Sequence, residues 1–133
     1  MDETMFRPEK TAIKRKRESL PARRFLNEAV VQDWTTVLDW GCGKGRDVLY
    51  FAANGLIARG YDPHSRPTEP SNLTYRYITC FYVLNVIPTH EGRVECLKRA
   101  FSHADYDGAM YIAVRPWSSI NYYPKLVYSI QVY

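Results

Sequence analysis

The sequence contains few cysteines and no long apolar run, and both absences narrow the class of protein. Its three cysteines, Cys42, Cys80 and Cys96, form no close pair. Neither a disulfide framework nor a zinc cluster is therefore expected, and free thiols are typical of the reducing cytoplasm. No apolar run approaches the roughly 20 residues that span a bilayer, and residues 1–10 lack the apolar core of a secretory signal. We therefore expect a cytoplasmic protein with no membrane segment and no metal site.

The length allows one domain, and the positive charge is concentrated near the N-terminus. The chain has 133 residues and a net charge of +4, from 18 basic and 14 acidic residues. Residues 1–24 alone carry eight basic and four acidic side chains, which is the same difference of +4. We interpret residues 1–18 as a basic arm and residues 19–133 as a single domain. The arm is predicted to bind nucleic-acid phosphates, and the alternative is a solvated tail. The predicted contacts are Lys14, Arg15, Lys16 and Arg17.

Predicted helices and strands alternate along the domain, which indicates an α/β fold. Strands are expected at 36–40, 56–61, 75–86, 109–114 and 126–132, the last one antiparallel at an edge, and helices at 19–31, 47–54 and 90–102. Ser19 and Thr89 are the expected N-caps, and Asp107-Gly108 is an expected turn. This order predicts a Rossmann-like three-layer sandwich with a mainly parallel sheet. Only twelve residues, 63–74, precede the third strand. A further strand with its crossover does not fit there, so the sheet is expected to be shortened and to lack the strand that normally supplies an adenine contact.

A glycine-rich loop follows the first predicted strand and carries the main functional signal. The run from Val37 to Asp47 reads VLDWGCGKGRD, with glycines at alternate positions. Such a loop turns sharply and allows close approach to a ligand at the carboxyl ends of the strands. Arg46 occupies the third glycine position of a dinucleotide fingerprint, and Asp39 would repel a pyrophosphate. A ligand with an ammonium and a sulfonium fits better, so S-adenosylmethionine is favoured over NAD, and an NAD-binding module is the disfavoured alternative.

The two motifs together resemble those of class I S-adenosylmethionine-dependent methyltransferases. Val37–Gly45 is similar to their first motif and Gly60–Pro63 to their second. The resemblance implies that the loop and its preceding acid contact the methionine part, and that Asp62 holds the ribose. The cofactor-binding set that we predict is Asp39, Gly41, Cys42, Gly43, Gly45, Asp62 and Pro63.

A closer similarity, in order over residues 10–115, is to the longer methyltransferases associated with bacterial DNA phosphorothioation. It is carried by Lys10-Thr11-Ala12, Asp39–Asp47, Asp62-Pro63 with Arg66-Pro67, Tyr82–Ile87 and Ala113-Val114-Arg115.

Tyr82 and Asn85 are the candidate catalytic residues, because they follow the strand beside the predicted cofactor. The alternative for Asn85 is a structural role at the end of the strand. Cys42 is interpreted as a small filler of the glycine loop, with a thiol nucleophile as the alternative. The hypothesis is a methyltransferase for an undetermined acceptor, with nucleic acid as one substrate class. The alternative is a non-catalytic S-adenosylmethionine-binding protein or a subunit that works with a partner protein.

Overall fold

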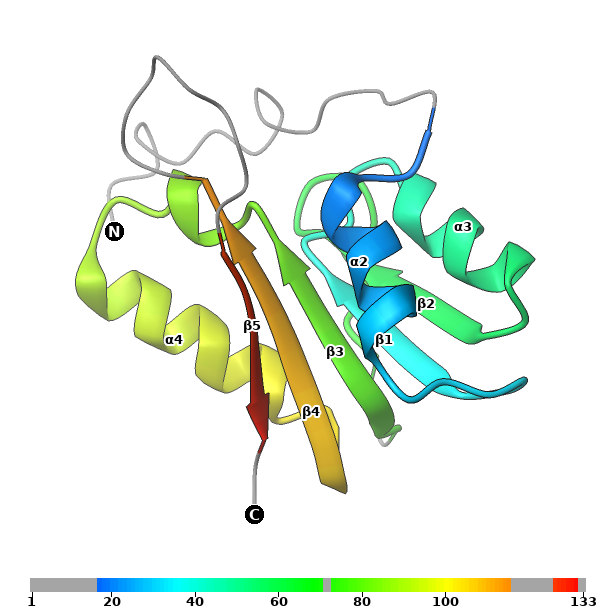
Figure 1. The fold of residues 1–133 in the computed structure, drawn as a ribbon. Helices are drawn as coiled ribbons and strands as arrows, with labels where there is room; N and C mark the ends of the chain where they lie inside the picture. Colours follow the sequence, from blue (N-terminus) through cyan, green and yellow to red (C-terminus); the bar gives the residue numbers. More distant parts are fainter. Residues whose placement is uncertain (1–16, 71–72, 116–125, 132–133) are drawn as a thin grey trace.

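A five-stranded sheet forms the centre of the domain, in the computed structural model of the chain (Figure 1). The structure describes residues 17–70, 73–115 and 126–131. The elements in chain order are α2 (Leu20–Glu28), β1 (Thr36–Trp40), α3 (Arg46–Ala53), β2 (Ile57–Tyr61), β3 (Tyr75–Phe81), the 3₁₀ turn η1 (Leu84–Val86), α4 (His90–Phe101), β4 (Ala104–Val114) and β5 (Leu126–Gln131).

The strand order is β2-β1-β3-β4-β5, and all pairs are parallel except the last. In the register of the central strands, Asp39 lies opposite both Gly60 of β2 and Thr79 of β3. Strand β5 pairs antiparallel with β4 at one edge, as predicted. The mainly parallel sheet is therefore confirmed, and the carboxyl ends of β1, β2 and β3 meet at one edge of the sheet.

Helices cover both faces of the sheet, which confirms the three layers (Figure 1). On one face, α2 and α3 pack on the sheet through Phe25 and Phe51, whose rings meet edge to face at 5.3 Å. The Phe25 ring also contacts Tyr77 and Tyr111 of the sheet. On the other face, α4 buries Ala100 against the sheet residues of a second core cluster. Burial of such aromatic area is a large part of the stabilisation of a domain of this size.

The two predicted N-caps are confirmed. Ser19 accepts a hydrogen bond from the amide of Ala22, and Thr89 accepts one from the amide of Gly92. Each cap satisfies a backbone donor that the first helical turn leaves unpaired. Helix α2 ends at Glu28 and not near residue 31, because Ala29 already has an extended backbone with ψ of 150°.

Two strand boundaries differ from the prediction by more than one residue, each for a local backbone reason. Strand β3 ends at Phe81, because Tyr82 adopts a left-handed backbone with φ of 61° and the chain then forms a 3₁₀ turn. The predicted turn at Asp107-Gly108 is wrong, because both residues lie inside β4, where the pairing register with β3 shifts. Such an irregularity absorbs extra residues without ending the strand.

The predicted gap after β2 is confirmed for the residues described there. Between Asp62 and Tyr75 they form no helix and only a single antiparallel bridge, from Asp62 to Arg66. Residues 66–70, here called the return segment, then share a cavity of about 290 Å³ with β2. The cavity is lined by Val48, Ala58, Arg59, Gly60, Arg66, Thr68 and Pro70. A short return segment thus leads from β2 toward β3 in place of a further strand and its crossover.

Candidate functional site

The glycine loop between β1 and α3 is held directly against the ends of β2 and β3. The amides of Gly41 and Cys42 both donate to the carbonyl of Tyr61, at 2.7 and 2.9 Å. Gly41 has φ of 81°, and a Cβ atom at this position would lie 2.3 Å from Cγ2 of Val83. Gly45, with φ of 83°, is the N-cap of α3. The loop therefore requires glycine both for its backbone conformation and for the close approach of the chain that follows β3.

Asp39 is a buried carboxylate next to this loop. Asp39 is only 3% exposed. Its Oδ1 atom accepts a hydrogen bond from the Thr79 hydroxyl at 2.8 Å. A buried carboxylate is costly unless it is hydrogen-bonded or paired. Thr79, from the neighbouring strand, thus orients the Asp39 carboxylate next to the glycine loop.

Asp62 is the second buried carboxylate of the site, at the end of β2. The residue is 5% exposed, and its Oδ2 accepts hydrogen bonds from the amides of His64 and Ser65 at 3.2 and 2.8 Å. These bonds fix the carboxylate within its own turn, as Asx turns do. Pro63 is exposed and follows directly. Carboxylates at the ends of two adjacent parallel strands therefore flank the glycine loop, as the sequence predicted.

The Cys42 thiol lies between these acids and remains protonated. Burial raises its pKa to about 12, and the negative charges of Asp39 and Asp62 add to this effect, against a smaller opposing effect of Arg66. Its Sγ is close enough to Gly60 that a Cβ on that glycine would lie 2.6 Å away. Since the thiolate is the reactive form of cysteine, these features support the interpretation of Cys42 as a filler.

We expect Cys42 to be nearly inert to iodoacetamide at pH 8. With a pKa of about 12, the fraction of Cys42 present as thiolate at pH 8 is on the order of a thousandth of that of an ordinary cysteine. Peptide mass spectrometry after a timed reaction would measure the modification, with the same peptide from unfolded protein as the control. Rapid alkylation of Cys42 in the folded protein would contradict this account and revive the nucleophile.

Tyr82 and Asn85 lie together at the end of β3, next to the glycine loop. Nδ2 of the Asn85 side chain donates to the backbone carbonyl of Arg115 at 2.7 Å, and Oδ1 of Asn85 accepts from the backbone amide of Arg115 at 2.9 Å. The Arg115 guanidinium lies over the Tyr82 ring, 4.4 Å from its centre. Asn85 therefore connects the residues that follow β3 to the end of β4. This contact agrees with the alternative interpretation of Asn85, a structural role at the end of the strand. A catalytic role for either residue stays a prediction.

Several contacts of the site were not predicted. Asp47, in the first turn of α3, accepts hydrogen bonds from the amide and the hydroxyl of Ser19, both at 2.7 Å. The guanidinium of Arg66 lies against Gly45, because a Cβ there would be 2.7 Å from its Nη2. The place of Arg66 in the motif after Asp62 was the sequence signal for this residue. The approach of its side chain to Gly45 depends on the tight turn that the Asp62–Arg66 bridge closes.

The predicted arm is represented only by its last residues. Lys14, Arg15 and Lys16 lie outside the described residues. Arg17 has a side chain that is 77% exposed and lies 3.8 Å from Glu18. The nucleic-acid contacts and the domain boundary at residue 18 therefore stay predictions.

None of the helices that the structure describes has the length and apolar character required to cross a membrane. Within the same residues, no three His, Cys, Asp or Glu side chains form a group that could hold a metal ion.

Fold and site together define a class: α/β domains in which a glycine loop and two carboxylates meet at the ends of adjacent parallel strands. Residues 3–126 match the family described as methyltransferase domain. The chain therefore belongs to this family. No curated protein matches the sequence.

Solved structures of methyltransferases share the fold at low sequence identity. A TehB-like S-adenosylmethionine-dependent methyltransferase from Corynebacterium glutamicum has 18% identity and a TM-score of 0.60, covering 86% of this chain and 71% of that chain. The magnesium protoporphyrin IX methyltransferase from Synechocystis, with bound S-adenosylmethionine, has 19% identity and a TM-score of 0.54, covering 72% and 56%. An amino pentose methyltransferase from Micromonospora echinaspora has 19% identity and a TM-score of 0.51, covering 77% and 50%. The chain thus spans about half the length of the latter two.

Proposed function

We propose that this protein binds S-adenosylmethionine and transfers its methyl group to an acceptor. The observation that carries the proposal is the pair of buried, hydrogen-bonded carboxylates, Asp39 and Asp62, on either side of the glycine loop. Membership of the methyltransferase-domain family and the fold shared with structures that contain S-adenosylmethionine support it.

The residues present fit this cofactor in charge and hydrogen bonding. Asp39 would pair with the ammonium of the methionine part, and Asp62 would accept hydrogen bonds from the ribose hydroxyls. When bound, S-adenosylmethionine supplies a methyl group on a sulfonium that is already activated, so that orientation of the acceptor provides much of the catalysis. This explains why a site with few acid–base groups suffices, and why the protonated Cys42 is not required as a nucleophile.

Calorimetric titration with S-adenosylmethionine tests the binding step, with NAD as the competing ligand. We expect saturable binding of S-adenosylmethionine and none of NAD, because Asp39 disfavours a pyrophosphate next to the loop. Absence of binding at millimolar S-adenosylmethionine would refute the proposal for this chain. Preferential binding of NAD would favour a dinucleotide-binding module.

Formation of S-adenosylhomocysteine separates the enzyme from the binding-protein alternative. That alternative is favoured by one observation, the shortened sheet after β2. Turnover with any acceptor would establish the methyltransferase. Tight binding without product over a broad set of acceptors would instead support a sequestering protein or a subunit of a larger complex with a partner protein.

Nucleic acid is the acceptor class that we propose to test first. The support is the net charge of +4 carried by residues 1–24 and the motif order shared with the methyltransferases associated with bacterial DNA phosphorothioation. Binding through phosphates would weaken steeply as salt increases. Affinity for a DNA duplex that is independent of salt, or unchanged after replacing Lys14, Arg15, Lys16 and Arg17 by glutamine, would contradict this role of the arm.

A further inference from the structure

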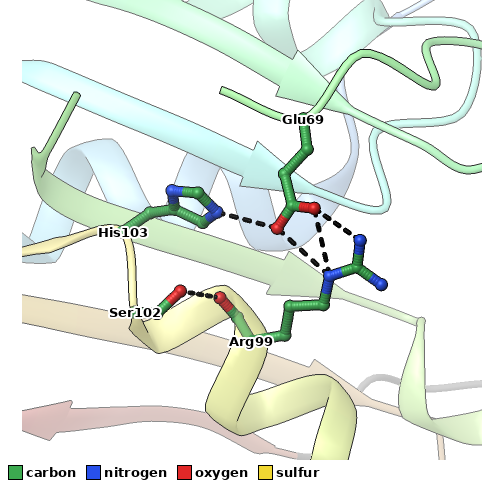
Figure 2. A network of polar contacts seen from close by, with 4 residues as sticks. All are labelled: Glu69, Arg99, Ser102 and His103. Atoms are coloured by element: carbon green, nitrogen blue, oxygen red, sulfur yellow. Dashed lines mark hydrogen bonds and ion pairs between the residues drawn. The ribbon is translucent and has the colours of Figure 1, made fainter. Parts of the chain in front are cut away.

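A polar cluster joins the return segment to helix α4 on the face of the sheet that α4 covers (Figure 2). Nη2 of Arg99 donates to Oε2 of Glu69 at 2.5 Å. Nε of Arg99 lies 3.1 Å from each of the two carboxylate oxygens of Glu69. Its Oε1 also lies 3.0 Å from Nε2 of His103. These hydrogen bonds, that from Arg99 above all, lower the pKa of Glu69 to about 2, so the carboxylate is ionised at neutral pH.

Arg99 and His103, the two partners of Glu69 in this cluster, pack against the strand residues next to Asp39 and Asp62. The His103 ring lies 5.5 Å from that of Trp40, and Trp40 stacks on Tyr61 at 4.3 Å. The Arg99 guanidinium lies over the Tyr61 ring, 5.9 Å from its centre. Trp40 follows Asp39 in the chain, and Tyr61 precedes Asp62. The His103 carbonyl also accepts a hydrogen bond from the amide at the start of β3.

The segment that follows Asp62 is held at its near end by a tight turn. Asp62 and Arg66 close a tight turn by two backbone hydrogen bonds, at 3.0 and 2.9 Å. Beyond that turn, the described residues form no strand or helix before β3, and a cavity separates the return segment from β2. At the far end of the segment, the bonds that Arg99 and His103 make to Glu69 anchor it to the end of α4.

We propose that Glu69, held by Arg99 and His103, is a positioning residue that keeps Asp62 in place for the ribose. This inference rests on the proposed function, because the ribose is that of S-adenosylmethionine. Glu69 acts through the turn and makes no contact with the cofactor.

A double-mutant cycle tests this coupling with S-adenosylhomocysteine as the ligand. Glu69→Gln is expected to raise the Kd about tenfold, a usual magnitude for a residue that acts on a site without touching the ligand. In an Asp62→Asn background the same substitution should change the Kd less than about twofold, because two changes that act on one contact are not additive. Glu95→Gln, which removes an exposed charge near Arg99 on the same helix, is the matched control and should leave the Kd unchanged.

Amide hydrogen exchange of the free protein gives a readout that needs no ligand. Glu69→Gln should accelerate exchange of the Ser65 and Arg66 amides, which bond to Asp62, by about tenfold, while amides of β1 and β3 keep their rates. If that variant does not fold, Arg99→Gln removes the same pair from the helix side. Unchanged exchange and an unchanged Kd, or fully additive effects in the cycle, would overturn the inference. A wild-type protein that binds no S-adenosylhomocysteine would refute the proposed function, whereas the exchange rates would still decide whether Glu69 holds the turn.

Discussion

Replacing Asp62 by alanine is expected to weaken the binding of S-adenosylmethionine on the order of 100-fold. A hydrogen bond to a charged group contributes about 1.5–3 kcal/mol, and two ribose hydroxyls would lose their acceptor together. The substitution also removes the acceptor of the His64 and Ser65 amides, so the turn itself loses its cap. Calorimetry at constant ionic strength would measure the loss.

Two further variants show whether the loss comes from the site. Asp62→Asn keeps an oxygen that can accept from the turn amides but removes the charge, so an intermediate affinity is expected. Asp107→Ala removes an exposed carboxylate near the amino end of β4, far from the strand ends of the site, and should bind normally. An Asp62→Ala variant with wild-type affinity would place the ribose elsewhere and remove the main support for the proposed function.

Replacing Gly41 by alanine is expected to destabilise the whole domain, on the order of 3 kcal/mol. A left-handed backbone costs about 1–2 kcal/mol for a residue with a Cβ, and overpacking costs about 1–3 kcal/mol. Both apply, since φ is 81° and the added Cβ would lie 2.3 Å from Val83. Urea denaturation would give the free energy of unfolding, and binding of S-adenosylmethionine should be lost along with the shape of the loop.

Val83→Ala separates the two causes of this loss. In a Val83→Ala background the clash with Cγ2 is gone and only the backbone cost remains. The effect of Gly41→Ala should then be about half as large. An equal effect in both backgrounds would mean that the approach of Val83 to the loop does not matter, and a negligible effect in both would contradict the left-handed conformation.

Elements defined by local chemistry could be predicted from the sequence. The first strand, Thr36–Trp40, was predicted with its observed bounds because a short β-rich run ends at a glycine loop. Ser19 and Thr89 were recognised as caps because the capping bond is made within three residues. The positions of Asp39 and Asp62, the acids proposed to bind the cofactor, followed from their places at the ends of strands, because parallel pairing brings these ends to one edge of the sheet.

Features that depend on tertiary contacts could not be predicted in this way. Strand β3 was extended too far because Val83 to Val86 are mostly apolar, and nothing local shows that Tyr82 takes a positive φ. The contact of Glu69 with Arg99 joins residues 30 positions apart. Glu69 stands in a proline-rich segment that reads as a plain loop, so its partners appear only once α4 is packed on the sheet.

The shortened sheet ends at β2, which is therefore an edge strand. An open edge strand is a template onto which other chains add strands, and this is a common route to aggregation. Strand β2 has only five residues and contains Arg59, and short edge strands with charged side chains are features that limit such pairing.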